Sequence, residues 1–444
     1  MACLQIMSTP MSETTCCIVG GGPAGVMLGY LLARRGVAVK VLEKHNDFFR
    51  DFRGDTVHPS TLELFYELGL LDDFLKLPHQ RITAIGGVVG DYPFEAAYLR
   101  HVPTHCKFVA LMPQWDFLDF LAAQAKRFSS FDLRVQHEAV DLMEEIGRIQ
   151  GVVARTPQGE IKIRADLVIG CDGRHSTVRR AARLEVQEFG VPIDVLWFRI
   201  SRTSNDPDKA FGNVNFGRVL ILINRGDYFQ AGLLIRKDGL DEVKRAGLDR
   251  FRETIRRIAP YLGDRVNEIH DWDQVKLLSV QVNRLRRWYR PGLLCIGDAA
   301  HAMSPVGGVG INLAIQDAVA AANLLGRPLL EGRVTDAMLA RVQCRREFPA
   351  RVTQQFQVMA HKGLQQVFRK PGPTKAPWPL KVFNSVPGAQ QLLGRFIAVG
   401  VRPEHIAGSP GYRAASRRRI LRLAVVTGVL AGLAAGFLRR RVAA

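Results

Sequence analysis

The first apolar runs of the chain are separated by a glycine cluster and a segment with helical spacing. Residues 16–19 are apolar, glycines dominate 20–25, helix-forming residues continue to about Arg35, and a second apolar run covers 37–42. Short apolar runs bounded by turn residues are typical of buried strands, and a helix between two such strands makes a βαβ unit. The pattern therefore predicts strand, helix and strand within residues 14–43.

Residues 44–188 predict a mixed order of helices and strands. An amphipathic pattern with apolar residues through Leu71 predicts a helix capped by Ser60, and a second helix is expected to begin at Gln114. Short apolar runs broken by glycine and proline predict strands. These strands are expected within 82–108, 133–140, 152–155, 161–163 and 167–170.

The segment 189–283 is rich in β-branched and aromatic residues. Residues 224–227 are expected to form a hairpin turn, and an amphipathic stretch at 240–258 predicts one helix. We therefore expect an antiparallel layer inserted into the α/β pattern. Six of its aromatic residues are candidates either for a flat apolar pocket or for ordinary core: Trp197, Phe198, Phe211, Phe216, Tyr228 and Phe229.

The α/β pattern returns after residue 284. A buried strand is expected at 293–296, then a loop rich in proline and glycine at 305–310, and then a long alanine-rich helix. Beyond residue 325 the chain is helical and increasingly basic. Five prolines between 371 and 387 predict an irregular crossing there.

The glycine cluster has the spacing of a dinucleotide-binding turn. Gly20 allows a tight turn out of the strand, Gly22 allows a pyrophosphate to approach the backbone, and Gly25 allows the helix to pack closely on the sheet. The helix N-terminus offers free N–H groups to phosphates. Glu43, at the end of the second strand, is positioned to accept hydrogen bonds from a ribose diol.

Two further blocks place polar residues after buried strands. Asp172 and Arg179 share one short connection, which suits a phosphate or ribose contact but also a generic loop. Asp298 ends a later strand, where it would bind a polyol hydroxyl or cap the following helix. The backbone from Gly308 to Asn312 precedes a helix and can face an electron-rich group. His301 is expected only to support this loop.

The composition, with 47% hydrophobic and 23% charged residues among 444, is that of a globular chain long enough for two or three domains. Eight arginines and no acid follow residue 412, so about +11 of the net charge of +19 belongs to the rest of the chain (19 − 8). Such a surplus suits nucleic acid, anionic lipid or a phosphorylated cofactor. Because no zinc spacing or nucleic-acid motif accompanies it, no nucleic-acid partner and no metal site are expected.

Seven cysteines are scattered through the chain, and an odd, dispersed set argues for a reducing compartment and a cytoplasmic protein. Near the end, arginines bracket an uncharged run at 423–438. As a helix this run would extend about 24 Å, less than the roughly 30 Å hydrocarbon core unless the arginines snorkel. We expect residues 416–444 to attach to the cytoplasmic face of a membrane, spanning it or lying in the interface. The alternative is a helix that docks on protein.

Three blocks occur in the order GGGPAG with Glu43, DGRHSTVR at 172–179, and GDAAHAMSPVGGVGIN at 297–312. Together they resemble the single-component FAD-dependent monooxygenases related to para-hydroxybenzoate hydroxylase. The likeness covers about residues 14–345 and is specific for the superfamily, not for a substrate. It implies an α/β fold with a discontinuous Rossmann-like FAD-binding domain, an inserted β-rich substrate domain and a helical C-terminal region.

The implied domains alternate along the chain. The FAD-binding domain is expected to comprise residues 14–80, 106–185 and 284–345, and the substrate domain residues 81–105 and 186–283. A helical region at 346–415 and the basic, hydrophobic tail at 416–444 would follow.

The resemblance also implies roles for single residues, while no protein side chain is expected to be the catalytic group. Gly20, Gly22 and Gly25 would hold the pyrophosphate, and Glu43 would hold the adenosine ribose. Asp172 and Arg179 belong to a motif shared by FAD and NAD(P)H.

Other residues would lie along the flavin end of the cofactor. Asp298 would contact the ribityl chain, and Arg53, Gln114 and Pro305 would lie near the flavin. Gly308, Gly310 and Asn312 would present N–H groups to the flavin ring.

The implied reaction uses NADPH or NADH and O2 to hydroxylate or epoxidise an electron-rich, aromatic or lipophilic substrate through a flavin C4a-hydroperoxide. The cofactor carries the difficult chemistry, and the protein positions and shields it. A FAD-dependent reductase or dehydrogenase without oxygen insertion shares every cofactor motif and is the alternative. A halogenase is less favoured because no WxWxIP-like segment follows the first βαβ unit.

Overall fold

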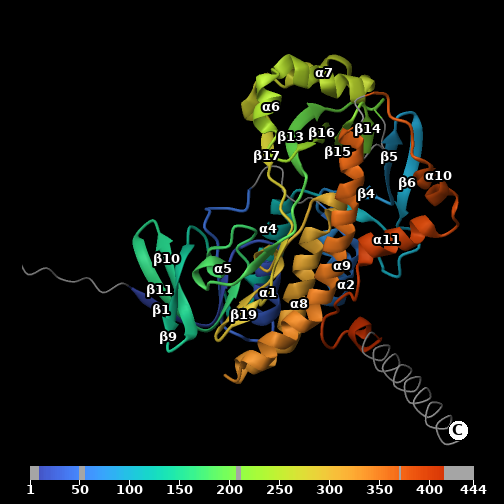
Figure 1. Ribbon diagram of the computed structural model, residues 1–444. Helices are drawn as coiled ribbons and strands as arrows, with labels where there is room; N and C mark the ends of the chain where they lie inside the picture. Colours follow the sequence, from blue (N-terminus) through green and yellow to red (C-terminus); the bar gives the residue numbers. More distant parts are fainter. Residues whose placement is uncertain (1–9, 50–55, 207–211, 370–371, 415–444) are drawn as a thin grey trace, which may run out of the picture.

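The structure is a computed structural model that describes residues 10–49, 56–206, 212–369 and 372–414. Arg53, Phe211 and the tail at 416–444 lie outside the described residues. Two layers dominate the molecule: an eight-stranded sheet with helices packed on it, and a seven-stranded sheet above it (Figure 1).

The predicted βαβ unit forms the centre of the eight-stranded sheet. Strand β1 (Met11–Val19) pairs in parallel with β2 (Val39–Leu42) on one side and with β11 (Gly159–Gly170) on the other, and α1 (Pro23–Ala33) connects β1 to β2. Residues 16–19 are buried, as expected for a parallel strand covered on both faces. The remaining strands are β8 (Phe131–Arg134), β9 (Glu138–Glu145), β10 (Arg148–Thr156), β19 (Tyr289–Arg290) and β20 (Leu293–Cys295).

Two strand predictions were wrong in this sheet. The runs at 161–163 and 167–170 are parts of the single strand β11. The run at 133–140 is divided between β8 and β9, which are not neighbours in the sheet. The physical reason is pairing: β11 pairs with β10 over its first half and with β1 along most of its length. The residues between its two apolar runs therefore stay hydrogen-bonded within the sheet, and the strand is continuous.

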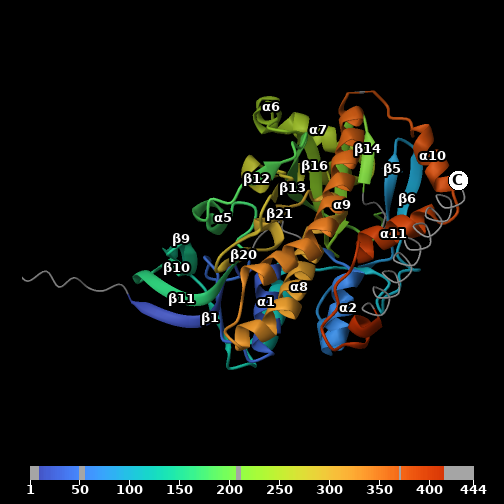
Figure 2. The ribbon, with the colours of Figure 1, turned by 60° about the horizontal axis from the view of Figure 1, so that its bottom comes forward.

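Helices pack against this sheet. Helix α1 contacts α4 (Gln114–Ala125) and α8 (Gly310–Leu330), and α8 lies beside the long helix α9 (Asp336–Phe368) (Figures 1 and 2). Other helices of this layer are α2 (Pro59–Leu68), α3 (Leu71–Phe74) and α5 (Thr177–Ala181). Ser60 was wrongly predicted as a cap: α2 begins at Pro59 with His58 as its N-cap, because proline is favoured in a first helical turn.

The seven-stranded sheet combines strands from two distant parts of the chain. Its order is β17 (Lys276–Leu278), β13 (Ile193–Ser201), β16 (Tyr228–Arg236), β15 (Arg218–Asn224), β14 (Gly212–Asn215), β5 (Ala84–Val89) and β6 (Tyr92–Tyr98). The two parts meet where β14 pairs in parallel with β5. The predicted hairpin turn at 224–227 connects β15 to β16 and is confirmed.

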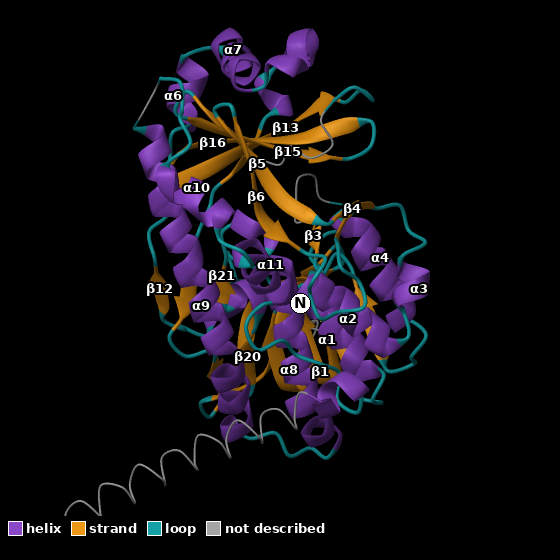
Figure 3. Cartoon of the chain, turned by 90° about the vertical axis from the view of Figure 1, so that its right-hand side faces the viewer, coloured by secondary structure: helices purple, strands orange, loops and turns teal. Residues whose placement is uncertain are grey.

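The helix predicted at 240–258 is two helices, α6 (Leu240–Arg245) and α7 (Leu248–Ile258). Gly247 lies between them with φ of +90°, a backbone angle that ends a helix and that glycine adopts readily. A helical segment, η1 (Pro260–Glu268), and a short turn, η2 (Trp272–Gln274), then lead to β17. These helices cover the outer face of the seven-stranded sheet (Figure 3).

Short elements join the layers. One small sheet contains β12 (Val186–Glu188), β18 (Asn283–Leu285) and β21 (His301–Ala302), and another contains β3 (Thr56–Val57), β7 (Val109–Leu111) and β4 (Gln80–Ile82). The turns η3 (Gly297–Ala299) and η4 (Val306–Gly308) precede α8. The predicted irregular crossing at 371–387 contains a helix, α10 (Trp378–Ser385), which α11 (Ala389–Val399) follows.

The proposed domain boundaries stay a prediction, although sheet membership changes at similar places in the chain. Within the described residues, one helix, at 306–330, is long and apolar enough to cross a membrane. Most of it is buried inside the protein, as in an ordinary core helix.

One buried carboxylate connects several parts of the core. Asp317, on α8, accepts hydrogen bonds from the Gly297 amide at 3.0 Å and from Arg346 Nε at 2.8 Å, and it pairs with His301 Nε2 at 2.5 Å. Arg346 also lies 3.7 Å from Glu404, which Arg345 holds at 2.7 Å. Burial by itself raises the pKa of Asp317, but His301 and Arg346 outweigh it, and the pKa is lowered.

We predict that Asp317→Asn lowers the free energy of unfolding by about 3–5 kcal/mol, because it removes the negative charge that pairs with the buried guanidinium group of Arg346. Urea unfolding monitored by circular dichroism at pH 7 measures this. The matched control is Asp249→Asn, which removes an exposed partner of Arg252 and should leave the unfolding midpoint nearly unchanged. Equal effects of the two substitutions would contradict the role of the buried network.

Candidate functional site

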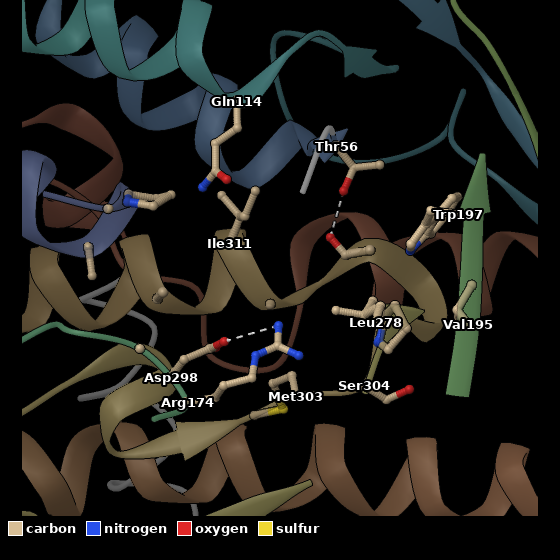
Figure 4. Close-up of a pocket in the computed structure, with 18 of the residues that line it drawn as sticks. Thr56, Gln114, Arg174, Val195, Trp197, Leu278, Asp298, Met303, Ser304 and Ile311 are labelled. Carbon is tan, nitrogen blue, oxygen red and sulfur yellow. Dashed lines mark hydrogen bonds and ion pairs between the residues drawn. The ribbon is translucent and has the colours of Figure 1, made fainter. Parts of the chain in front are cut away.

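A cavity of about 970 Å³ lies between the two main sheets. Its lower wall is formed where β1, β2, β11 and β20 end, which is where ligands bind in open α/β sheets. Its roof is the inner face of the seven-stranded sheet. In Figure 4, Gln114 and Asp298 lie toward one end and Trp197 and Val195 toward the other, with Ile311 between them.

The glycine turn is shaped by close backbone contacts. Gly20 has φ of +107°, and a Cβ there would lie 2.5 Å from the Cys171 carbonyl oxygen. A Cβ on Gly25 would lie 1.9 Å from the carbonyl oxygen of Gly20. A Cβ on Gly22 would meet no atom within 4 Å, although Gly22 lines the cavity at the N-terminus of α1. Glycine is thus required at positions 20 and 25 by close backbone contacts, whereas the space beside Gly22 can hold a ligand.

Glu43 braces the same turn from the end of β2. Its Oε2 accepts a hydrogen bond from the Gly21 amide at 3.0 Å, and its Oε1 accepts one from the His45 amide at 3.1 Å. The carboxylate also lines the cavity. Because each carboxylate oxygen can accept more than one hydrogen bond, Glu43 can hold the loop and still bind a hydroxyl.

Asp172 lines the cavity where β11 ends. Its Oδ2 accepts a hydrogen bond from the Val178 amide at 3.1 Å, whereas Oδ1 is buried without a partner among the described residues. Burial raises the pKa of this carboxyl group, against the hydrogen bonds that Ser176 and nearby amides donate to it. An unsatisfied buried oxygen beside a cavity is a candidate ligand contact.

Arg179, by contrast, does not line the cavity. Its guanidinium group donates to the carbonyl of Arg174 and, at 3.5 Å, to Asn283. Among the described residues, the arginine that lines the cavity is Arg174, whose Nη2 lies 3.9 Å from Asp298 Oδ2 (Figure 4). Sequence reasoning missed Arg174; its position directly after the Asp172–Gly173 turn was the available signal.

The loop before α8 faces the cavity through Pro305, Gly308 and Gly310. Gly308 has φ of +62°, and its carbonyl accepts a hydrogen bond from Thr56 Oγ1 at 2.8 Å. Asn312 does not line the cavity. Its Oδ1 accepts hydrogen bonds from the His58 amide at 2.9 Å and from Thr61 Oγ1 at 2.8 Å. The Asn312 side chain therefore fixes this loop to the start of α2.

Helix α9 holds the same loop from the other side. Gln357 Oε1 accepts from the Ser304 amide at 3.0 Å, and its Nε2 donates to the carbonyls of Ser304 and Val306 at 2.9 and 3.0 Å. His361 Nε2 lies 2.8 Å from Ser304 Oγ. Sequence reasoning missed both α9 residues, because only the fold brings them next to the loop.

The roof separates the aromatic candidates. Trp197 lines the cavity together with apolar residues of β13, β15 and β17, and its Nε1 is buried without a partner among the described residues. Phe198 and Phe229 belong to the core on the outer face of the sheet, with Phe251. Tyr228 and Phe216 are outside the cavity lining. Trp197 therefore fits the pocket interpretation, whereas Phe198 and Phe229 fit the core interpretation.

Of the other expected site residues, Gln114 lines the cavity as the first residue of α4, whereas His301 is buried beside Asp317 and outside the cavity. Gly25 contacts Gly20 and not the cavity. The described residues contain no group of three or more His, Cys, Asp and Glu suited to a metal ion.

His58 is a buried cavity residue whose charge affects stability. Its Nδ1 donates to the carbonyl of Ile397 at 2.9 Å, which is the tautomer that a carbonyl requires. Burial lowers the pKa of His58 to about 4, although this hydrogen bond opposes the shift. The unfolded chain therefore takes up a proton near pH 6.5, where the folded chain does not.

We predict that His58 lowers the free energy of unfolding by up to roughly 3 kcal/mol as the pH falls from about 6.5 to about 4. His58→Asn, which keeps a donor for Ile397, should remove part of this acid sensitivity in urea unfolding at pH 7 and pH 4.5. His101→Asn, at an exposed position, is the control. The prediction fails if wild type and His58→Asn lose stability in parallel.

Known proteins resemble this chain over most of its length. The family described as "FAD binding domain" matches residues 13–356. The 6-methylpretetramide 4-monooxygenase of Streptomyces rimosus is 33% identical over 357 residues, covering 77% of this chain and 83% of that protein. A rifampicin monooxygenase of Streptomyces venezuelae is 27% identical, covering 68% of this chain and 61% of its own length.

A solved structure agrees in fold. The anhydrotetracycline hydroxylase OxyS from Streptomyces rimosus superimposes with a TM-score of 0.68 at 20% identity, covering 89% of this chain and 78% of that chain. At this identity the likeness concerns the fold alone.

Proposed function

Because the chain belongs to the family of single-component FAD-dependent monooxygenases related to para-hydroxybenzoate hydroxylase, we propose that it uses NAD(P)H and O2 to oxygenate an electron-rich, lipophilic aromatic compound. The overall reaction converts substrate, NAD(P)H, H⁺ and O2 into oxygenated substrate, NAD(P)⁺ and water. The observation that supports the substrate class is that no charged side chain of the described residues lines the cavity roof.

The residues of the cavity floor fit FAD. A Cβ on Gly22 would project into empty space at the N-terminus of α1, where amides and the helix dipole favour a phosphate. Farther along the floor, Asp172 offers an unsatisfied oxygen. A ligand with phosphates at one end and hydroxyl groups along its length would satisfy both features.

Under this proposal the floor holds the cofactor from end to end. Gly20 and Gly22 would approach the pyrophosphate and Glu43 the adenosine ribose, while Asp298, with Arg174 beside it, would bind the ribityl hydroxyls. Asp172 and Gln114 would contact the cofactor farther along. Bound FAD supplies the redox chemistry by accepting a hydride equivalent from NAD(P)H and activating O2.

The loop from Pro305 to Gly310 would set the position of the reacting end. Its backbone is held by Thr56 on one side and by Gln357 on the other, so its amides keep a fixed direction. Such prearranged donors stabilise developing negative charge without reorganisation. Arg179 and Asn312 would act through their neighbours, since neither lines the cavity.

The roof would select the substrate and exclude water. Its lining residues from β13, β15 and β17 are apolar, among them Val195, Ile221 and Leu278, and Gln230 and Trp197 add the polar groups. Apolar walls with few polar groups favour flat, neutral ligands. The named substrate of the relative from Streptomyces rimosus, 6-methylpretetramide, gives a starting compound for tests.

The direct test purifies the full chain, records its flavin spectrum and follows NAD(P)H oxidation, O2 uptake and product mass with 6-methylpretetramide and a panel of polycyclic phenols. We expect substrate-dependent O2 uptake and a product heavier by one oxygen atom, labelled when ¹⁸O2 is supplied. Turnover without O2 uptake would favour the reductase alternative. A protein that binds no FAD would overturn the proposal.

We predict that Gly22→Val yields a folded protein without bound flavin, because the branched side chain fills the space at the phosphate position. Flavin content is measured from absorbance at about 450 nm and folding from the melting temperature. Gly190→Val is the matched control, because a Cβ there also meets no atom within 4 Å but lies outside the cavity. A yellow Gly22→Val protein would refute this placement of the pyrophosphate.

A further inference from the structure

Positive charge is concentrated in the last part of the chain. Residues 348–403 contain eight Lys and Arg and no Asp or Glu. The next acid, Glu404, is buried and paired with Arg345. No carboxylate within residues 348–403 therefore offsets the exposed basic residues there.

Exposed apolar side chains lie within this basic segment. Trp378, Val382 and Val386 are 75%, 51% and 48% exposed, and Leu392 on α11 is 73% exposed. The first three are four residues apart, so they follow one face of α10 and its C-terminal end. Lys375, Lys381 and Arg395 are exposed near them in the sequence, and the Lys381 ammonium group lies 5.8 Å from the centre of the Tyr92 ring. We call these seven residues the α10–α11 face.

Helix α11 and the segment before α10 approach the edge of the seven-stranded sheet closely, whereas α10 itself has no buried residue. A Cβ on Gly394 would lie 2.0 Å from the Tyr98 carbonyl, and one on Gly90 would lie 1.9 Å from the Thr374 carbonyl. Asn384 Nδ2 donates to the Tyr92 hydroxyl at 3.3 Å. Both helices lie beside β6, at the edge of this sheet (Figure 1).

We propose that the α10–α11 face docks on an anionic lipid surface. Basic residues are attracted to the negative headgroups, and an apolar row that includes a tryptophan inserts at the interface. An isolated exposed apolar residue needs no explanation, but four along α10, its C-terminal end and α11, in a stretch of chain without acids, match an interfacial segment. The described helices carry this proposal without the tail at 416–444.

Docking in this orientation also places the cavity near the lipid. Helix α10 and α11 contact β6, which pairs with β5, and Ile85 and Gly86 of β5 line the cavity. A lipophilic substrate dissolved in the membrane would then lie close to the roof. This consequence does not depend on which reaction follows.

The position-specific test uses Trp378 as the reporter. The full chain is mixed with phosphatidylcholine vesicles containing 30% phosphatidylglycerol, with part of the phosphatidylcholine brominated to quench nearby tryptophan. We expect quenching that Trp378→Phe abolishes, while both proteins still sediment with the vesicles. Quenching that is equal in the two proteins, or absent from both, would overturn the proposal.

Charge is tested by Lys375→Gln combined with Lys381→Gln in the full chain. Each basic residue at an anionic surface contributes about 1 kcal/mol, so we expect the vesicle dissociation constant to rise by roughly fivefold per charge. Lys244→Gln with Arg250→Gln, exposed on α6 and α7, is the matched control. Equal weakening by the two pairs would contradict a specific face.

Dimerisation through the same face can be distinguished from lipid docking. In that case Trp378→Ser with Leu392→Ser would shift a concentration-dependent dimer to monomer in sedimentation equilibrium without vesicles. That result would overturn lipid docking. A monomer in both proteins, together with weaker vesicle binding of the variant but not of Ile146→Ser, would support it. Ile146 is an exposed apolar residue in the turn between β9 and β10, two strands that lie on the other side of the molecule from α10 in Figure 1.

Discussion

The buried carboxylate of Asp317 is the constraint on which the arrangement of the cavity floor depends. It receives the amide of Gly297, the ring of His301 and the guanidinium of Arg346, so one side chain joins α8, the turn that carries Asp298, and α9. A charge without water must be matched by partners at close range. The turn is consequently held in one place, and Asp298 faces the cavity.

Helix α9 extends this constraint from the floor to the roof. Arg346 belongs to the Asp317 network, Gln357 holds the loop at 304–306, and Leu364 lines the cavity. Phe368, at the end of the helix, packs with residues of the seven-stranded sheet. This one continuous helix therefore contacts both the cavity floor and the roof.

The two halves of the cavity have different chemistry for a structural reason. The floor is made of strand ends and helix starts. Backbone amides there have no partner within the helix or strand, and carboxylate side chains lie beside them. The roof is the middle of a mostly antiparallel sheet, where backbone groups pair with one another and alternate side chains face inward. Polar cofactor contacts below and an apolar substrate surface above follow from this division.

The sequence by itself determined the βαβ unit, the three cofactor blocks and the inserted β layer, because strand periodicity, glycine spacing and acids at strand ends are local features. It could not distinguish Arg174 from Arg179, or Trp197 from Phe198. Trp197 and Phe198 are adjacent in β13 and therefore face opposite sides of the sheet. Arg174 lies in the turn after β11, whereas Arg179 lies in α5 and donates to the Arg174 carbonyl. Gln357 and His361 reach the loop only because α8 and α9 pack side by side. Local pattern thus predicted the kind of site, and tertiary packing decided which side chains form it.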